Sequence, residues 1–253
     1  MKKNDCWQPP TDLTLATDEV HLWLASLEQP PACVDAFLAT LAPDEQKRAA
    51  RFVFAKDQRS FTVARGILRA LLGRYLQTPP ASLSFTYNSY GKPALLEPAA
   101  QPALCFNLSH SHQMALFAFA YECELGVDIE YMRDLERDDY LLMADSHFSP
   151  GEYATLSALP ESQRKAAFFR CWSRKEAYIK ARGMGISIPL DSFDVSCAPG
   201  EPAALLASRE APHTVTSWEL STPTVPPDYA AALIVTRPPR RIRAYQWSAL
   251  NIV

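Results

Sequence analysis

The chain has 253 residues, 48% of them hydrophobic, and a formal net charge of -3 at pH 7. This length suits one large domain or two small ones with a sizeable core, and the charge gives no reason to expect nucleic-acid binding. No stretch reaches the ~20 apolar residues that span a bilayer, and the six cysteines suggest neither a zinc site nor a disulfide framework. We therefore expect a soluble, cytoplasmic protein with no nucleic-acid or membrane partner.

The first predicted elements are a strand and two helices. Residues 20–24 alternate like a strand, with every second side chain apolar. One helix is expected to begin at Pro43, and a second, over 57–76, has an apolar stripe at helical spacing that leaves Arg65 and Arg69 outside it. The two helices and the segment between them carry eight Lys or Arg against three Asp or Glu, which predicts a local basic surface.

The middle of the chain combines a turn with a buried strand. In the turn 88–93, Gly91 allows a backbone shape that other residues resist, and Lys92 beside it either presents a cation to an anionic ligand or belongs to an ordinary turn. The apolar run Met114–Tyr121 predicts a buried strand. His110 and His112 precede it, but two histidines without a third partner are a weak metal signal.

Two acids stand two positions apart in the segment Gly126–Glu130. In a strand, Asp128 and Glu130 point to one side while Val127 and Ile129 point to the other. Oxygen ligands placed in this way suit Mg²⁺, especially when the phosphates of a substrate complete its coordination shell. The alternative is the solvated face of an amphipathic strand.

A third acid lies in a predicted helix that ends at Gly183. On a period of 3.6 residues, Glu176 shares a face with Phe169 and Trp172, so a carboxylate lies on the side that the aromatic residues carry inward. A carboxylate in that place needs a partner. Lys180, one turn further along, is a candidate for an ordinary i,i+4 ion pair.

The helix before this one is expected to begin at Ser149, with Pro150 in its first turn. Glu152 would reach back as part of the cap, and we assign it to that role. Residues 186–195 should return as a strand or an extended segment. Three further strand-like runs follow, at 215–220, 229–235 and 242–247. The chain thus suggests two halves, each with a helix and then strands.

Taken in this order, the motifs resemble those of the phosphopantetheinyl transferases of the Sfp type. The matching pieces are Gly91-Lys92-Pro93, Phe106–Ser111, Gly126–Glu130 and Trp172–Ala177 with Lys180 and the glycines at 183 and 185. Arg48 with the following segment 52–57 also looks like the first basic segment of that family. The likeness covers about 43–195.

The resemblance implies an α+β fold of two similar halves related by pseudo-twofold symmetry, at 1–122 and 123–253, with the active site in the cleft between them. It implies transfer of the 4'-phosphopantetheine arm of coenzyme A to a serine of an apo acyl or peptidyl carrier protein, with Mg²⁺ as cofactor and adenosine 3',5'-bisphosphate as product. Two similar halves in one chain would already form the cleft, so a monomer is expected.

The resemblance also implies roles for individual residues. The positions of the metal-binding acids are those of Asp128, Glu130 and Glu176. The positions that contact the nucleotide and its 3'-phosphate are those of Arg48, Lys92, Ser109 and His110, and those near the diphosphate are Lys175 and Lys180. As a hypothesis, Glu176, or a metal-bound water that it orients, takes the serine proton, with His110 as the rival base, and Lys180 stabilises the departing phosphate.

Two other readings stay open. One is a metal-independent, coenzyme A-dependent acyltransferase in which His110 deprotonates the acceptor. The other is a non-catalytic module that binds coenzyme A or a carrier protein and whose acids are structural. The pathway of the carrier, whether fatty-acid, polyketide or nonribosomal-peptide synthesis, also stays open. Because carriers are usually acidic, the basic helices at 43–76 or the arginines at 237–243 are candidate docking surfaces.

Overall fold

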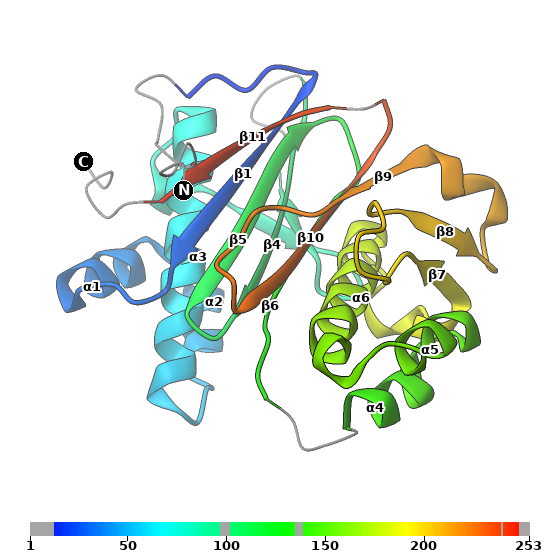
Figure 1. Cartoon of the computed structure of the whole chain (residues 1–253). Helices are drawn as coiled ribbons and strands as arrows, with labels where there is room; N and C mark the ends of the chain where they lie inside the picture. Colours follow the sequence, from blue (N-terminus) through cyan, green and yellow to red (C-terminus); the bar gives the residue numbers. More distant parts are fainter. Residues whose placement is uncertain (1–12, 97–101, 135–138, 239, 248–253) are drawn as a thin grey trace, which may run out of the picture. The chain divides into compact units, whose positions relative to one another are not determined.

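The computed structural model describes residues 13–96, 102–134, 139–238 and 240–247. Helices and strands are mixed along the chain, which confirms the predicted α+β class. The described residues divide into two compact units, which Figure 1 shows. The first unit holds the residues up to Tyr87, then Pro93–Glu122 and the segment from Arg241 on; the second holds Asn88–Lys92 and Cys123–Arg240.

The first unit is built on a four-stranded sheet with the order β11-β1-β5-β4. Its strands are β1 (Glu19–Ser26), β4 (Leu104–Ser111), β5 (Met114–Tyr121) and β11 (Arg241–Gln246). The helices are α1 (Pro31–Thr40), α2 (Pro43–Ala49) and α3 (Ala55–Leu76), followed by the 3-10 turn η1 (Pro80–Ser82) and a small hairpin of β2 (Phe85–Tyr87) and β3 (Pro93–Leu95). The apolar stripe of α3 forms one core with the sheet, in which Ile67 and Leu71 are buried together with Trp23 and Phe117.

The second unit is built on a three-stranded antiparallel sheet with the order β6-β10-β9. Its strands are β6 (Leu125–Tyr131), β9 (Trp218–Ser221) and β10 (Tyr229–Thr236), and β7 (Phe193–Val195) pairs with β8 (Leu205–Ser208) in a separate hairpin. The helices are α4 (Asp139–His147), α5 (Pro150–Ser157) and α6 (Glu161–Arg182), and the 3-10 turns are η2 (Gly185–Ser187), η3 (Leu190–Ser192) and η4 (Pro212–Ser217).

The two units repeat one topology. In the first, β1 pairs with β5 and β5 with β4; in the second, β6 pairs with β10 and β10 with β9, and all four pairings are antiparallel. Three helices follow β1 and three follow β6, and the last helix of each set, α3 or α6, is 22 residues long. Each of these long helices stops at a residue with left-handed backbone, Gln77 or Gly183. The chain therefore uses the same arrangement of strands and helices twice.

The units differ from the predicted halves in two segments. Strand β11 belongs to the first unit because it pairs in parallel with β1, and Arg243 Nε lies 2.7 Å from the carboxylate of buried Glu19. The turn 88–92 belongs to the second unit because Asn88 Nδ2 donates a hydrogen bond of 2.6 Å to the carbonyl of Gly183. Both assignments depend on partners far away in the sequence.

Most of the predicted helices and strands are present, including the buried strand β5 and a capping box at the start of α5. One prediction is wrong over most of its length. Residues 186–195 do not form a continuous extended segment, since two 3-10 turns, η2 and η3, precede the short strand β7. Among the described residues, no helix is both long and apolar enough to cross a membrane.

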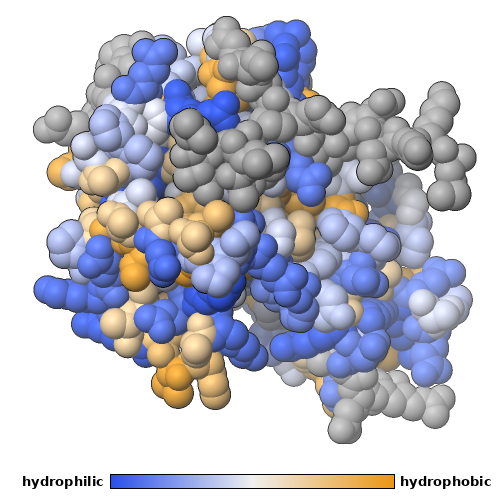
Figure 2. Space-filling view, turned by 90° about the vertical axis from the view of Figure 1, so that its left-hand side faces the viewer, coloured by the Kyte–Doolittle hydropathy of each residue, from blue (hydrophilic) through white to orange (hydrophobic). Residues whose placement is uncertain are grey.

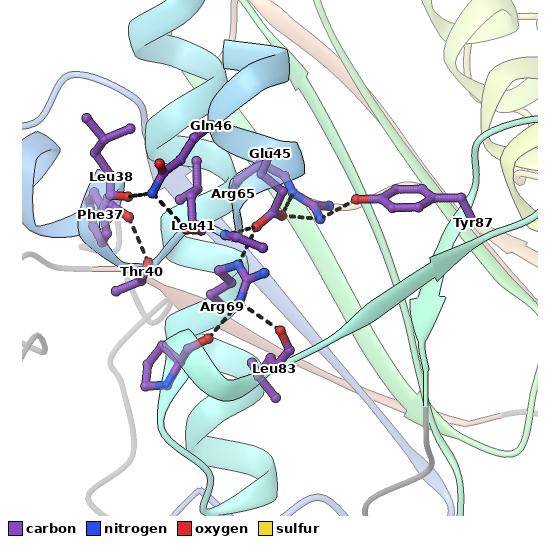
Figure 3. Close-up of polar contacts among 12 residues, drawn as sticks. Phe37, Leu38, Thr40, Leu41, Glu45, Gln46, Arg65, Arg69, Leu83 and Tyr87 are labelled. Carbon is purple, nitrogen blue, oxygen red and sulfur yellow. Dashed lines mark hydrogen bonds and ion pairs between the residues drawn. The ribbon is translucent and has the colours of Figure 1, made fainter. Parts of the chain in front are cut away.

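The predicted basic surface is wrong at Arg65 and Arg69, which are 6% and 0% exposed. Figure 3 shows both guanidinium groups converging on Glu45 of α2, to which each donates a hydrogen bond of 2.6 Å from Nε. Arg69 also donates to the carbonyl oxygens of Pro80, at 2.8 Å, and Leu83, at 3.0 Å. Buried charges persist when they are paired and hydrogen-bonded, so this network joins α2, α3 and the segment after them.

Other cations of this region stay exposed on the surface of the first unit, namely Lys47, Arg48, Arg51, Lys56 and Arg59. Three apolar side chains between α2 and α3 are exposed as well, those of Phe52, Val53 and Phe54. Figure 2 shows hydrophilic and hydrophobic residues interspersed on the face that it draws. The surface of α2 and α3 therefore carries fewer exposed positive charges than the sequence predicts, and these charges lie beside exposed apolar side chains.

The Glu45 network predicts a specific loss of stability. The substitution Glu45→Gln leaves two buried guanidinium groups without their counter-charge, and we expect it to lower the free energy of unfolding by about 3–5 kcal/mol. Urea denaturation followed by circular dichroism measures this loss. The control is Glu28→Gln, at an exposed position of the same unit, for which we expect a change within about 0.5 kcal/mol. Equal effects of the two substitutions would contradict the role of Glu45.

Candidate functional site

The site is built where helix α6 lies against strand β6. A Cβ atom on Gly126 of β6 would lie 2.1 Å from the carbonyl oxygen of Ala177 and 2.5 Å from the backbone nitrogen of Ala181. Both distances are far too short for real atoms, so only glycine allows the helix backbone to come this close to the strand. The glycine that precedes the two acids in the sequence is thus a packing requirement of the site.

The helix geometry decides which side chains reach the strand. Successive residues of an α-helix are about 100° apart, so Ala177 and Ala181 face β6 while Glu176 and Lys180 flank that contact, roughly 40° from each other. On β6, Gly126, Asp128 and Glu130 share one face because side chains alternate along a strand. The glycine at the contact therefore identifies the face of β6 toward α6 as the one that carries the two acids.

Asp128 and Lys180 form an ion pair across this contact. The Lys180 ammonium lies 2.6 Å from Oδ1 of Asp128, which is 1% exposed, whereas Lys180 keeps 30% of its side chain exposed. The residues opposite the two acids on β10 are small, with Ala232 beside Asp128 and Ala230 beside Glu130. Lys180 therefore does more than form an i,i+4 pair with Glu176 on its own helix. Its ammonium group also neutralises the buried carboxylate of Asp128 on β6.

Glu176 lies in an environment that favours its protonated form. Burial raises the pKa of Glu176 above the ordinary value of a carboxyl group. The charge of Asp128 raises this pKa further, while the charge of Lys180 opposes both effects. The carboxyl group of Glu176, half-buried on α6, therefore accepts a proton more readily than an exposed carboxylate does.

The three predicted metal ligands do not form a ready cation site. Asp128, Glu130 and Glu176 have the hard oxygen donors that Mg²⁺ prefers. Yet over 13–96, 102–134, 139–238 and 240–247, no three histidine, cysteine or acidic side chains are grouped so that they could hold a metal ion. At Asp128 the counter-charge is the ammonium of Lys180. The donor chemistry therefore suits Mg²⁺, and a bound ion would have to take the place of Lys180 as the counter-charge of Asp128.

Lys92 lies at the C-terminal end of α6. Its ammonium donates to the carbonyl oxygens of Ala181, at 2.8 Å, and Leu125, at 3.3 Å. The neighbouring Asn88 donates to the carbonyl of Gly183 at 2.6 Å. Cations and donors are stabilising at the carbonyl end of a helix, so the turn 88–92 caps α6 and brings Lys92 to the second unit.

Lys175 occupies a different place from the one that the resemblance implied. Its side chain is 0% exposed, and its ammonium lies 2.6 Å from Oε2 of Glu152. Glu152 also completes the capping box of α5 with Ser149, as the sequence predicted. The structure therefore brings Asp128, Glu176 and Lys180 together and places Lys175 in the core.

The remaining predicted residues lie in the first unit. Arg48 is exposed in the last turn of α2, with its guanidinium 5.4 Å from the ring centre of Phe61. Ser109 is buried near the end of β4, and the adjacent His110 is exposed. Sequence reasoning did not single out two further residues that shape the site, Gly126 as the contact of α6 and Asn88 as its cap. For Gly126 the available signal was a glycine two residues before Asp128 in a predicted strand.

Comparisons with known proteins show the family to which this chain is similar. A family model described as the 4'-phosphopantetheinyl transferase superfamily matches 124–234, and one described as the N-terminal part of a 4'-phosphopantetheinyl transferase matches 28–122. The chain is 44% identical over 215 residues to the 4'-phosphopantetheinyl transferase HetI of Nostoc sp., a match that covers 85% of this chain and 86% of the relative. It is 28% identical over 205 residues to the 4'-phosphopantetheinyl transferase Sfp of Bacillus subtilis, covering 81% and 86%.

The chain therefore belongs to the 4'-phosphopantetheinyl transferase family, and it is an enzyme of this transferase class. The resemblance inferred from the motifs is confirmed. The boundary between the two family matches falls where the chain passes from the first unit to the second, between Glu122 and Cys123.

The Asp128–Lys180 pair predicts how the protein responds to divalent cations. A cation that approaches Asp128 and Glu176 is repelled by the ammonium of Lys180. We expect Lys180→Met to raise the affinity for Mn²⁺ about tenfold, measured by isothermal titration calorimetry without coenzyme A. The control is Lys165→Met, which removes a lysine of α6 that pairs with the exposed Asp134 and should leave the affinity unchanged. An affinity that stays the same in both variants would contradict the competition.

Proposed function

We propose that the chain transfers the 4'-phosphopantetheine arm of coenzyme A to a serine hydroxyl of an apo acyl or peptidyl carrier protein, in a Mg²⁺-dependent reaction that releases adenosine 3',5'-bisphosphate. The observation that carries the proposal is the pairing of Lys180 with buried Asp128 beside a carboxyl group, that of Glu176, whose pKa is raised. Membership of the transferase family supports it. We further propose that the enzyme acts as a cytoplasmic monomer.

The proposed reaction makes one bond and breaks one. The serine oxygen attacks the phosphorus that carries the pantetheine arm, and the bond from this phosphorus to the oxygen that bridges the two phosphates breaks. The electron pair of that bond leaves with adenosine 3',5'-bisphosphate, which gains a negative charge. The serine proton must pass to a base. Catalysis of such a transfer depends on positioning and on the stabilisation of charge.

Glu176 is the proposed base. Its raised pKa makes it a better proton acceptor than an ordinary surface carboxylate. It projects from a 22-residue helix that close backbone packing holds at Gly126, so its position does not depend on a loop. The rival base, His110, lies exposed on β4 of the first unit, and it remains the base in the alternative acyltransferase reading.

Lys180 is the proposed cation for the leaving group. The ammonium group of Lys180 lies next to the carboxylate of Asp128, and part of the Lys180 side chain is exposed to solvent. An anionic phosphate that enters beside Asp128 can take up donors of this ammonium, and the developing negative charge would then be stabilised in the transition state. Asp128 would hold Lys180 in place before the substrate arrives.

Magnesium enters the proposal through the chemistry of the donors. Asp128, Glu130 and Glu176 would supply hard oxygen ligands, with phosphate oxygens of the substrate completing the set. When bound, the ion would reduce the repulsion between the phosphate oxygens and the attacking hydroxyl. Arg48, Lys92, Ser109 and His110 are proposed to contact the nucleotide and its 3'-phosphate. We leave Lys175 out of the ligand-binding set because its ammonium is already bonded within the core.

Mass spectrometry of purified apo carrier proteins tests the proposal. Each carrier is incubated with the protein, coenzyme A and Mg²⁺, and a parallel sample contains excess EDTA. We expect a mass gain of one phosphopantetheine arm per carrier and release of adenosine 3',5'-bisphosphate, both abolished by EDTA.

Other outcomes would contradict parts of the proposal. Product formation in EDTA would remove the metal requirement. Transfer of an acyl group from acyl-coenzyme A, without phosphopantetheine transfer, would favour the acyltransferase reading. Binding of coenzyme A without modification of fatty-acid, polyketide or nonribosomal-peptide carriers would favour a binding module.

A further inference from the structure

Lys175 is saturated with hydrogen-bond acceptors inside the second unit. Its ammonium lies 2.6 Å from Oε2 of Glu152, and it donates to the carbonyl oxygens of Leu190 at 2.7 Å and Phe193 at 2.6 Å. An ammonium group has three N–H donors, so these three acceptors use all of them. The Phe193 ring covers the group as well, with its centre 4.3 Å from Nζ. No donor of Lys175 is left for a phosphate.

Glu152 is equally occupied. Its Oε2 accepts a hydrogen bond of 2.9 Å from the backbone nitrogen of Ser149, and its Oε1 accepts one of 2.8 Å from the backbone nitrogen of Val195. The carboxylate is 3% exposed. The pair therefore links the start of α5, the middle of α6 and strand β7. A single buried contact holds three elements that are separate in sequence.

The first unit contains a counterpart of this pair. Glu45 of α2 accepts a hydrogen bond of 2.9 Å from the backbone nitrogen of Ala42, as Glu152 does from Ser149, and each acid is the third residue of its helix. Arg69 is the fifteenth of the 22 residues of α3, and Lys175 is the fifteenth of the 22 residues of α6.

The two cations also share their remaining contacts. Each is 0% exposed, each donates to two backbone carbonyls that follow its helix, and each lies near a phenylalanine ring, that of Phe85 for Arg69 and Phe193 for Lys175. A feature that occurs at the same place in both repeats belongs to the repeated scaffold. The residue after Arg69 is Ala70, whereas the residue after Lys175 is Glu176, so the acid next to the pair occurs in the second unit alone.

The position of the pair on α6 explains what it does for the site. On the helix, Lys175 lies about 160° from Ala177 and about 120° from Ala181, the two residues that contact β6. The helix is therefore held on two well-separated sides, by Gly126 of β6 on one and by Glu152 on the other. Glu176 projects between them. A rotation of the helix by ~20° would move the end of a side chain by ~2 Å, and shifts of this size can cost about 100-fold in rate.

We propose that Lys175 is a positioning residue: its ion pair with Glu152 fixes the rotation of α6 and thereby directs Glu176. The inference rests on the proposed function in so far as Glu176 is the working carboxylate. It replaces the role near the diphosphate that the resemblance implied for Lys175. Of the two lysines that the resemblance placed near the diphosphate, Lys175 and Lys180, only Lys180 then binds the substrate.

The test compares four proteins with wild type: Lys175→Met, Glu152→Gln, the double variant with both changes, and the control Lys165→Met. Carrier modification gives kcat and the KM for coenzyme A, calorimetry gives the Kd of coenzyme A, and thermal melting gives Tm. Lys175→Met leaves the Glu152 carboxylate buried without its cation, and we expect Tm to fall by roughly 10 °C and kcat by about 100-fold. KM and Kd for coenzyme A should stay within about threefold of wild type, because Lys175 touches no substrate.

The double variant separates positioning from ligand binding. It removes both buried charges, so we expect it to recover most of the lost Tm, while kcat stays at least about tenfold below wild type because the pair that fixes the helix is still missing. A Kd for coenzyme A more than tenfold weaker in either Lys175 variant, or wild-type kcat in the double variant, would overturn the proposal. If Lys175→Met does not fold, the double variant carries the same comparison. Absence of product with wild type would refute the proposed function instead, and the Tm and Kd values would still decide whether Lys175 stabilises α6 through Glu152 or binds coenzyme A.

Discussion

The close contact between α6 and β6 at Gly126 is the constraint on which the site depends. Any side chain at that position would overlap the backbone of α6 near Ala177. With the backbones in contact, the residues that flank the contact on the helix necessarily reach the acids of the strand, and Lys180 pairs with Asp128. The same packing leaves Glu176 half-buried, which raises its pKa. One glycine thus determines both the ion pair and the environment of the proposed base.

The two units repeat one scaffold, and the proposed base belongs to the second of them. In both units a buried cation at the fifteenth residue of the 22-residue helix pairs with a buried acid, which is the third residue of a preceding helix. A buried pair of this kind contributes little net stability, but loss of one partner is costly. The buried ion pair can therefore fix the orientation of the long helix in either unit. In the second unit, the carboxyl group of Glu176 directly follows the buried cation Lys175, and its direction is then fixed with the helix. The first unit has Ala70 there and instead carries exposed cations such as Arg48.

Sequence reasoning was strongest where local patterns decide the structure. The period of apolar residues located α3, the capping pattern located the start of α5, and four short motifs in order indicated the family, as the comparisons confirmed. It was weakest where the partner of a charge lies far along the chain. Arg65 and Arg69 fall outside an apolar stripe, yet Glu45, 20 and 24 residues away, allows both to be buried. The resemblance placed Lys175 near the diphosphate, and the sequence did not reveal its buried partner, because Glu152 reads there as part of a helix cap. The pairing of β11 with β1 lies equally outside what local patterns contain.

The most direct test of this account is the rate of carrier modification by Glu176→Gln, measured together with its affinity for coenzyme A. The substitution keeps the shape of the side chain but removes its ability to take up a proton. The account predicts a loss of about 100- to 10,000-fold in kcat, with coenzyme A bound as in wild type and with Glu161→Gln, in the exposed first turn of the same helix, fully active. A variant that retains wild-type turnover would contradict the role of Glu176, and with it the claim that the contact of α6 with β6 places the base.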